Sequence, residues 1–112
     1  MANFKAGDVV KVPFPYTDRA TRQHRPALVI SAPALEDTHG LLWVSMITSA
    51  ENRAWPSDIA LNDLAGTGLP VASLIRTAKI ATIEARDAEL LGRIDTATSA
   101  AVRHRIAEQF GL

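Results

Sequence analysis

The sequence predicts a mainly β domain in which five to seven short strands form a small barrel, followed by one amphipathic helix. Short runs rich in β-branched residues fill the first two thirds of the 112 residues, and a helical period begins only near the end. Many short strands joined by tight turns favour a barrel, because closing the sheet hides its edges. We expect residues 1–112 to form a single domain.

The expected strands are short apolar runs bounded by turn-forming residues. Segment 32–40 contains Pro33, Asp37 and Gly40 and is interpreted as a turn between two of them. The expected strands are 9–14, 26–31, 41–48, 58–61, 71–76 and 79–84.

The last quarter of the chain changes to a helical period. Residues 86–91 are interpreted as one short helical turn ended by Gly92. A longer helix is expected over 96–110, with the Asp95 carboxylate as its N-cap and Gly111 as its stop. Its apolar face is expected to hold Val102, Ile106 and Phe110.

Composition excludes several classes of function. The chain has 12 basic and 12 acidic residues, so contact with nucleic acid would have to be local rather than driven by net charge. Cysteine is absent, which removes disulfides and thiolate catalysis. His24, His39 and His104 lack the spacing of metal ligands, and no phosphate-binding Gly-rich loop occurs. We therefore expect neither a metal nor a cofactor.

The chain also lacks the apolar segments that target a protein to a membrane. Its longest apolar stretch is 41–44, far short of the ~20 residues that span a bilayer. The N-terminus has no apolar core of a signal peptide. We expect a cytoplasmic protein without a membrane partner.

Arginine and hydroxyl side chains stand where the expected strands begin and end. Arg25 precedes a strand, Thr48 and Ser49 end the next one, and Arg76 ends a later one. A guanidinium group matches phosphate oxygens as a fork, and a hydroxyl adds a donor, so this set suits a phosphodiester. From the residues alone, a surface arginine before a rigid proline and a Thr-Ser turn explain the pattern as well.

Segment 15–25 is the most basic part of the chain and contains a single carboxylate, Asp18. Its basic side chains are Arg19, Arg22, His24 and Arg25. They are candidates for contacts with RNA, although a solvated loop is an equal alternative. Tyr16 and Trp55 are candidates for stacking on bases, whereas Trp43 lies in an apolar run and is expected in the core.

Four segments resemble, in order and spacing, the signatures of the MazF/PemK toxin family. They are GDVVKV at 7–12, HRPALVIS at 24–31, ITS at 47–49 and the stretch 69–80. The stretch 13–18 is similar to one branch of the family, and the resemblance covers the chain from Gly7 to about Leu91. Each segment alone is unspecific, but the four together identify the family.

The resemblance implies an SH3-like β-barrel with a C-terminal helix, usually a homodimer, acting as the toxin of a type II toxin–antitoxin system. It implies metal-independent cleavage of single-stranded mRNA at short motifs, growth arrest, and a cognate antitoxin as partner. The family's catalytic arginine and threonine match Arg25 and Thr48. Arg76 matches an arginine expected near the RNA phosphates.

The roles of these residues follow from their chemistry. Arginine stays protonated at neutral pH, so Arg25 is expected to stabilise charge rather than to accept a proton. Thr48 would orient the scissile phosphate. Histidine can accept a proton near neutral pH, but neighbours on a strand face opposite sides, so the general base stays open between His24 and another group.

Two other functions fit the same expected fold. One is a CcdB-like inhibitor that binds DNA gyrase without catalysis, and the other is an inactive relative or adaptor. The signature of Arg25-Pro26 and Thr48-Ser49 favours the ribonuclease over the gyrase inhibitor, and an inactive relative or adaptor would show no toxicity when expressed alone.

Overall fold

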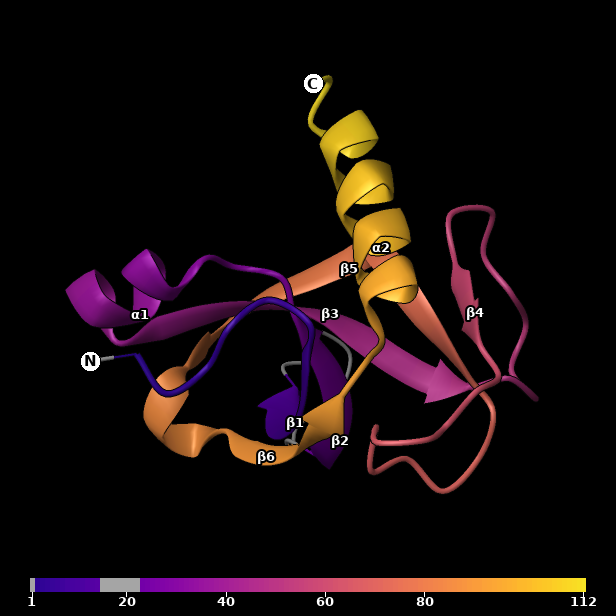
Figure 1. Cartoon of the computed structure of the whole chain (residues 1–112), viewed down its shortest axis with the longest axis horizontal. Helices are drawn as coiled ribbons and strands as arrows, with labels where there is room; N and C mark the ends of the chain where they lie inside the picture. Colours follow the sequence, from indigo (N-terminus) through magenta and orange to yellow (C-terminus); the bar gives the residue numbers. More distant parts are fainter. Residues whose placement is uncertain (1, 15–22) are drawn as a thin grey trace.

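The computed structural model describes residues 2–14 and 23–112. Six antiparallel strands form one curled sheet in the order β4-β5-β3-β2-β1-β6, and α2 stands across it (Figure 1). The strands are β1 (Asp8–Phe14), β2 (Gln23–Val29), β3 (Leu41–Ser49), β4 (Ile59–Leu61), β5 (Ser73–Glu84) and β6 (Glu89–Arg93). The helical elements are α1 (Pro33–His39), the 3-10 turn η1 (Ala85–Asp87) and α2 (Thr96–Gln109). The helices and strands account for most of the described residues.

The predicted mainly β fold with a C-terminal helix is confirmed. Within the described residues the edge strands β4 and β6 do not pair with each other, so the sheet is a half-barrel.

The sheet buries an apolar cluster on each of its faces, because successive side chains of a strand point to opposite sides. The first cluster consists of Val10, Val12, Phe14, Ala27, Val29, Leu42, Val44, Met46, Ile83 and Ala85. The second cluster consists of Val9, Leu28, Ile47, Leu61, Leu69, Ile75, Ile94 and Val102, the last of these from α2. The first cluster marks the face on which the candidate site lies.

The ladder between β3 and β5 contains an irregularity that the sequence did not show. Ser45 pairs with Ile80, but the next residue, Met46, pairs with Arg76. Residues 77–79 of β5 therefore have no pairing partner in β3. The sequence predicted separate strands over 71–76 and 79–84, and the structure joins them into one strand with a bulge.

The interpretation of segment 32–40 as a turn was wrong, because the segment forms α1. Pro33 lies in the first turn of the helix, where a missing N–H costs nothing. Gly40 ends the helix at φ 68°, and its N–H donates to the Glu36 carbonyl oxygen at 2.8 Å. Proline and glycine are typical both of turns and of the ends of short helices, and in this segment they begin and end a helix.

The helical turn predicted over 86–91 is wrong in its extent. Only Ala85–Asp87 forms a 3-10 turn, and Gly92 lies inside β6 rather than ending a helix. A Cβ at Gly92 would lie 2.3 Å from the Gly66 carbonyl oxygen, and the Arg93 N–H donates to that oxygen at 2.8 Å. Glycine is required here because two backbones meet, a contact between segments distant in sequence.

The structure confirms the predicted capping of α2. The Thr98 N–H donates to Asp95 Oδ1 at 2.7 Å, and this hydrogen bond lowers the pKa of the Asp95 carboxyl. Val102 is buried, but Phe110 is 65% exposed, so the sheet covers only part of the apolar face. Within residues 2–14 and 23–112, no helix has the length and apolar character needed to cross a bilayer.

The prediction that Trp43 lies in the core was wrong. Trp43 shares its face of β3 with Ile47, away from the first cluster, and is 44% exposed. It lines a groove of about 380 Å³ between α1 and the end of α2, where Phe110 also lies.

Candidate functional site

Arg25 and Thr48 lie on neighbouring strands and face the same side of the sheet. The pairing of β2 with β3 runs from Val29 opposite Val44 to Ala27 opposite Met46. Arg25 and Thr48 each stand two residues beyond Ala27 and Met46, in the same direction along the sheet, and therefore share the face of that pair. Arg25 is also paired with Val12 of the first cluster. The two residues at the centre of the predicted site thus come together where the first cluster ends.

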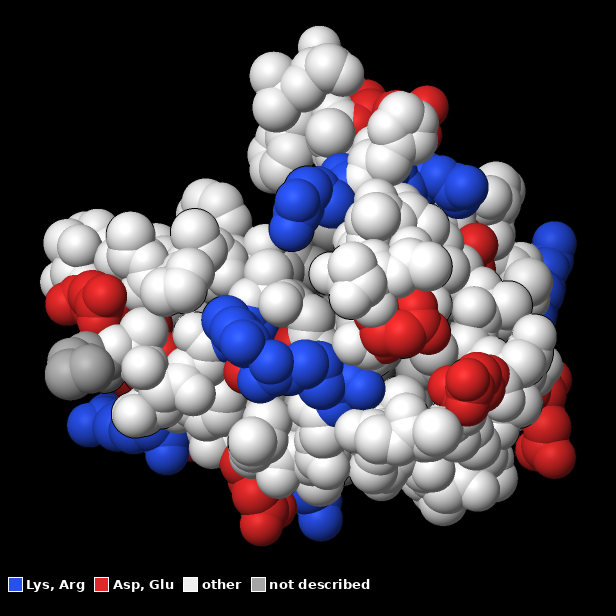
Figure 2. Space-filling view, in the orientation of Figure 1, with Lys and Arg blue, Asp and Glu red and all other residues white. Residues whose placement is uncertain are grey.

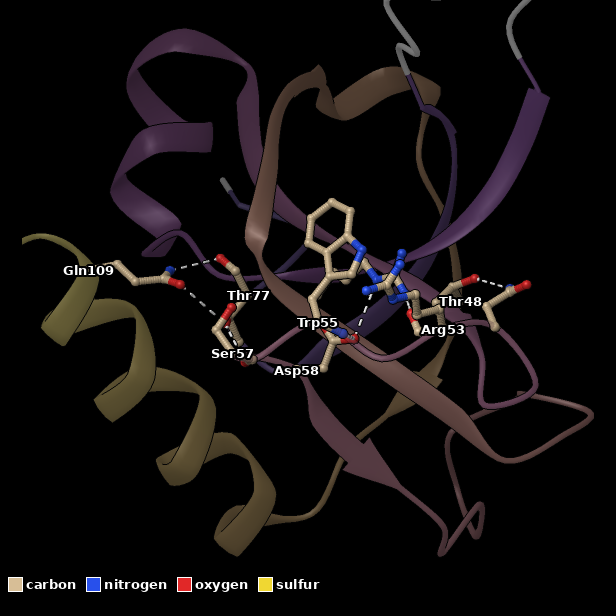
Figure 3. Close-up of polar contacts among 9 residues, drawn as sticks. Thr48, Arg53, Trp55, Ser57, Asp58, Thr77 and Gln109 are labelled. Atoms are coloured by element: carbon tan, nitrogen blue, oxygen red, sulfur yellow. Dashed lines mark hydrogen bonds and ion pairs between the residues drawn. The ribbon is translucent and has the colours of Figure 1, made fainter.

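The Thr48 hydroxyl has a defined partner in the loop 50–58, which joins β3 to β4. Asn52 Nδ2 donates a hydrogen bond to Thr48 Oγ1 at 2.7 Å, drawn as a dashed line at Thr48 in Figure 3. Thr48 itself is only 8% exposed. Because the oxygen accepts from Asn52, its own O–H is left to donate elsewhere. Sequence reasoning missed Asn52, and the only signal was a polar residue four positions after Thr48.

Arg76 faces the same side, since it pairs with Met46, but its guanidinium is already engaged within the fold. Its Nε lies 3.4 Å from Asp58 Oδ2, and its Nη2 donates to the carbonyl oxygen of Arg53. Its guanidinium carbon lies 4.3 Å from the centroid of the Trp55 ring (Figure 3). With 10% of its side chain exposed, Arg76 ties the loop 50–58 to β5. Its predicted contact with RNA phosphates stays a prediction.

The bulge of β5 adds a second connection to the same loop. Thr77 Oγ1 donates to the Ser57 carbonyl oxygen at 2.8 Å. Gln109 Nε2, at the end of α2, donates to the Thr77 carbonyl oxygen at 2.9 Å (Figure 3). Thr77, an unpaired residue of the bulge, therefore links the loop to the C-terminal helix.

The other predicted site residues are less closely associated with this pair. Ser49 lies opposite Ser73, and its Oγ accepts from the Glu51 N–H at 3.3 Å, as a turn former does. His24 is exposed and, as the neighbour of Arg25 on β2, faces the other side of the sheet. Tyr16, Arg19 and Arg22 lie outside the described residues. The RNA contacts predicted for all five stay predictions.

The face of the sheet that α2 crosses, opposite the face of Arg25 and Thr48, carries mixed charge. Figure 2 shows basic and acidic side chains interspersed there, in keeping with the zero net charge. In the described part of the chain, no group of three or more His, Cys, Asp or Glu side chains could hold a metal ion. A guanidinium group beside a hydroxyl donor, as with Arg25 and Thr48, can bind a phosphate and stabilise negative charge on it.

A model of a known protein family matches nearly the whole sequence of the chain. The family of PemK-like, MazF-like toxins of type II toxin–antitoxin systems matches residues 5–110. The chain belongs to this family. Membership confirms the resemblance seen in the sequence and does not favour the alternative of a CcdB-like gyrase inhibitor. No curated protein sequence matches the chain.

Solved structures of the family share the fold. The chain is similar to MazF of Deinococcus radiodurans, with a TM-score of 0.79 and 25% identity over 97% of both chains. It is similar to MazF in the MazE–MazF complex of that organism, with a TM-score of 0.74 and 25% identity over 97% of this chain and 96% of that chain. An endoribonuclease of a mycobacterial species, solved with its cognate antitoxin, has a TM-score of 0.75 and 18% identity over 100% and 97% of the two chains, and this likeness shows the fold alone.

Proposed function

We propose that this toxin is an endoribonuclease that cleaves single-stranded mRNA at short sequence motifs without a metal ion and thereby arrests growth. The observation that carries the proposal is the common face of Arg25 and Thr48 on adjacent strands, in a chain of the MazF family. The Thr48 hydroxyl, already accepting from Asn52, is free to donate to a phosphate oxygen.

The proposed reaction is an in-line attack of the neighbouring 2′-OH on the scissile phosphorus. The bond from O2′ to phosphorus forms and the bond from phosphorus to O5′ breaks, which leaves a 2′,3′-cyclic phosphate and a 5′-OH. Arg25 stabilises the charge that builds on the phosphate oxygens, and Thr48 donates to one of them. His24 faces away from Arg25, which argues against it as the base that takes the 2′-OH proton.

Further contacts with the RNA would come from the basic segment and from the ends of the strands. The proposed set comprises Tyr16, Arg19, Arg22, His24, Ser49 and Arg76. Arginine contacts to phosphate would hold the backbone, and Tyr16 would stack on a base.

We propose an antitoxin as the protein partner and a homodimer as the functional state. The support comes from the relatives: MazF of Deinococcus radiodurans was solved with MazE, and a mycobacterial endoribonuclease with its cognate antitoxin. Because the proposed substrate is mRNA, the site of action would be the cytoplasm.

The test is to incubate the protein with a long single-stranded RNA in EDTA and to map the cut ends. We expect cuts at a short recurring motif, each leaving a 5′-OH, and loss of cleavage in Arg25→Ala. Arg86→Ala is the matched control, because Arg86 is 79% exposed and pairs only with Glu84 among the described residues. Intact RNA with well-folded wild-type protein would contradict the proposal. Growth arrest with DNA damage that persists in Arg25→Ala would instead support a gyrase inhibitor.

A further inference from the structure

We infer that Asn52 is a positioning residue for this cleavage, because it directs the Thr48 hydroxyl towards the substrate. A cluster formed by the Trp55 ring and the buried side chains of Asp58 and Arg76, here called the loop clamp, holds Asn52 in place. The inference rests on the proposed function and adds to it a residue that acts through Thr48 rather than on the RNA.

The hydrogen bonds of Thr48 decide where its proton points. A threonine hydroxyl carries one proton and two lone pairs, and Asn52 Nδ2 occupies one lone pair at 2.7 Å. The proton therefore has to point away from the Asn52 amide. A donor fixed in advance stabilises a developing negative charge without having to reorient during the reaction. Asn52 thus makes Thr48 a donor on the face that it shares with Arg25.

Asn52 is itself exposed, so something else has to hold the loop 50–58 in this conformation. At the start of the loop, the Ala50 N–H donates to the Ala72 carbonyl oxygen at 2.9 Å, and the Asn52 N–H donates to the Ser49 carbonyl oxygen at 3.0 Å. At its end, the Trp55 N–H donates to Asp58 Oδ2 at 2.8 Å. Both ends of the loop are therefore fixed, with Asn52 between them.

The loop clamp depends on a buried charge. The Asp58 side chain is 3% exposed, and its Oδ1 has no hydrogen-bond partner among the described residues. Burying a carboxylate is unfavourable unless a cation compensates its charge. Arg76 provides that cation at 3.4 Å, and the Trp55 ring covers the guanidinium. Removing the Arg76 charge would leave the Asp58 carboxylate buried without a cation, and removing the Asp58 charge would leave Arg76 with only the Arg53 carbonyl and the Trp55 ring, so either change would loosen the loop.

The main test exchanges the donor at position 52 for an acceptor of the same shape. In Asn52→Asp the carboxylate can only accept at neutral pH, so it draws the Thr48 proton away from the phosphate. We expect the single-turnover cleavage rate at saturating RNA to fall about 100-fold, near the cost of losing one preorganised donor. In Asn52→Ala the Thr48 hydroxyl rotates freely, and we expect the same cleavage rate to fall about tenfold, because the donor is still present but no longer fixed in direction.

The pH profile separates positioning from a merely structural role. An aspartate side chain has a reference pKa of about 3.9, and once protonated it can donate a hydrogen bond. The rate of Asn52→Asp relative to wild type should therefore rise as the pH falls from about 7 to about 5, which approaches that pKa. The ratio for Asn52→Ala should stay flat. Equal losses in both variants with flat ratios would overturn the inference.

The loop clamp is tested through its dependence on Asn52. Asp58→Asn should slow cleavage in the wild-type background but have little further effect in Asn52→Ala, because the clamp acts through Asn52. Trp55→Ala, at a side chain that is 39% exposed, gives the same test should Asp58→Asn fail to fold. Arg86→Gln, which removes an exposed ion pair with Glu84, is the control and should leave the rate unchanged. Additive losses would overturn the role of the clamp.

Failure of this inference can be told apart from failure of the proposed function. If the wild type cleaves RNA and Arg25→Ala does not, but both Asn52 variants keep the full rate, only the role of Asn52 is wrong. If the wild type leaves RNA intact, both proposals are wrong.

Discussion

On the face of the sheet that carries the candidate site, the ladder between β3 and β5 has two halves of different character on either side of the bulge at Ser45. On one side, Leu42 and Val44 of β3 are 1% and 0% exposed and belong to the first apolar cluster. On the other side, Thr48 and Arg76 are also buried, at 8% each, but both are polar and hydrogen-bonded to the loop 50–58.

The difference shows how one pair of strands can provide both stability and chemistry. Apolar side chains are stabilised by burial alone, in proportion to the area removed from water. Buried polar groups need partners, and the loop 50–58 supplies them. The bulge separates the two halves and leaves Thr77 free of the ladder, so that its hydroxyl and carbonyl contact Ser57 and Gln109. A substitution in one half should therefore change stability, and one in the other half should change cleavage.

The largest effect is expected in the apolar half. Leu42→Ala should lower the free energy of unfolding by about 2–5 kcal/mol, because it removes buried methyl groups and leaves a cavity. Urea denaturation measures this loss. The cleavage rate per folded molecule should stay at the wild-type value. A loss of cleavage at full folding would show that the two halves are coupled.

The next effect is expected at Arg25. Arg25→Lys keeps the charge but replaces a planar fork with a point charge, so we expect cleavage to fall about 100-fold. The urea midpoint should remain close to that of the wild type. Arg86→Lys, at an exposed arginine on η1, is the matched control. Full activity in Arg25→Lys would mean that charge alone is needed there.

An effect of about the same size is expected at Thr48. Thr48→Val keeps the shape but removes the hydroxyl, and we expect the rate at saturating RNA to fall about 100-fold, the cost of one preorganised donor, which is about 2.7 kcal/mol of activation free energy. The amide of Asn52 is exposed, so water can replace the lost acceptor, and stability should change little. A large fall in the unfolding midpoint would instead assign Thr48 to the stabilising half.

The smallest effect lies outside both halves, at the cap of α2. The hydrogen bonds from Thr98 lower the pKa of Asp95, because they favour the ionised carboxylate in the folded state. The resulting stabilisation is fully present at pH values above the ordinary pKa of 3.8. Asp95→Ala should lower the thermal midpoint slightly at pH 7. The difference from wild type should shrink as the pH falls below 3.8 towards the lowered pKa. Cleavage at neutral pH should not change, and a fall would show that α2 influences the site.

The errors made from the sequence have a common origin. Pro33 and Gly40 were assigned to a turn, but proline and glycine are also typical of the two ends of a short helix. Local sequence does not distinguish a turn from a short helix here. Gly92 was assigned to a helix end, although it is required by a backbone approach from Gly66. Trp43 was placed in the core because it stands in an apolar run, but it faces a groove that tertiary packing leaves open.

The sequence by itself determined the mainly β fold, the capped C-terminal helix and the family to which the chain belongs. These depend on local periodicity, capping residues and short motifs, all of which are present in neighbouring residues. Only the tertiary structure decided which residues meet. It placed Arg25 and Thr48 on one face through strand register and brought Asn52 to the Thr48 hydroxyl. It also buried Arg76 against Asp58, because the partners of a buried polar group come from distant segments that no local pattern specifies.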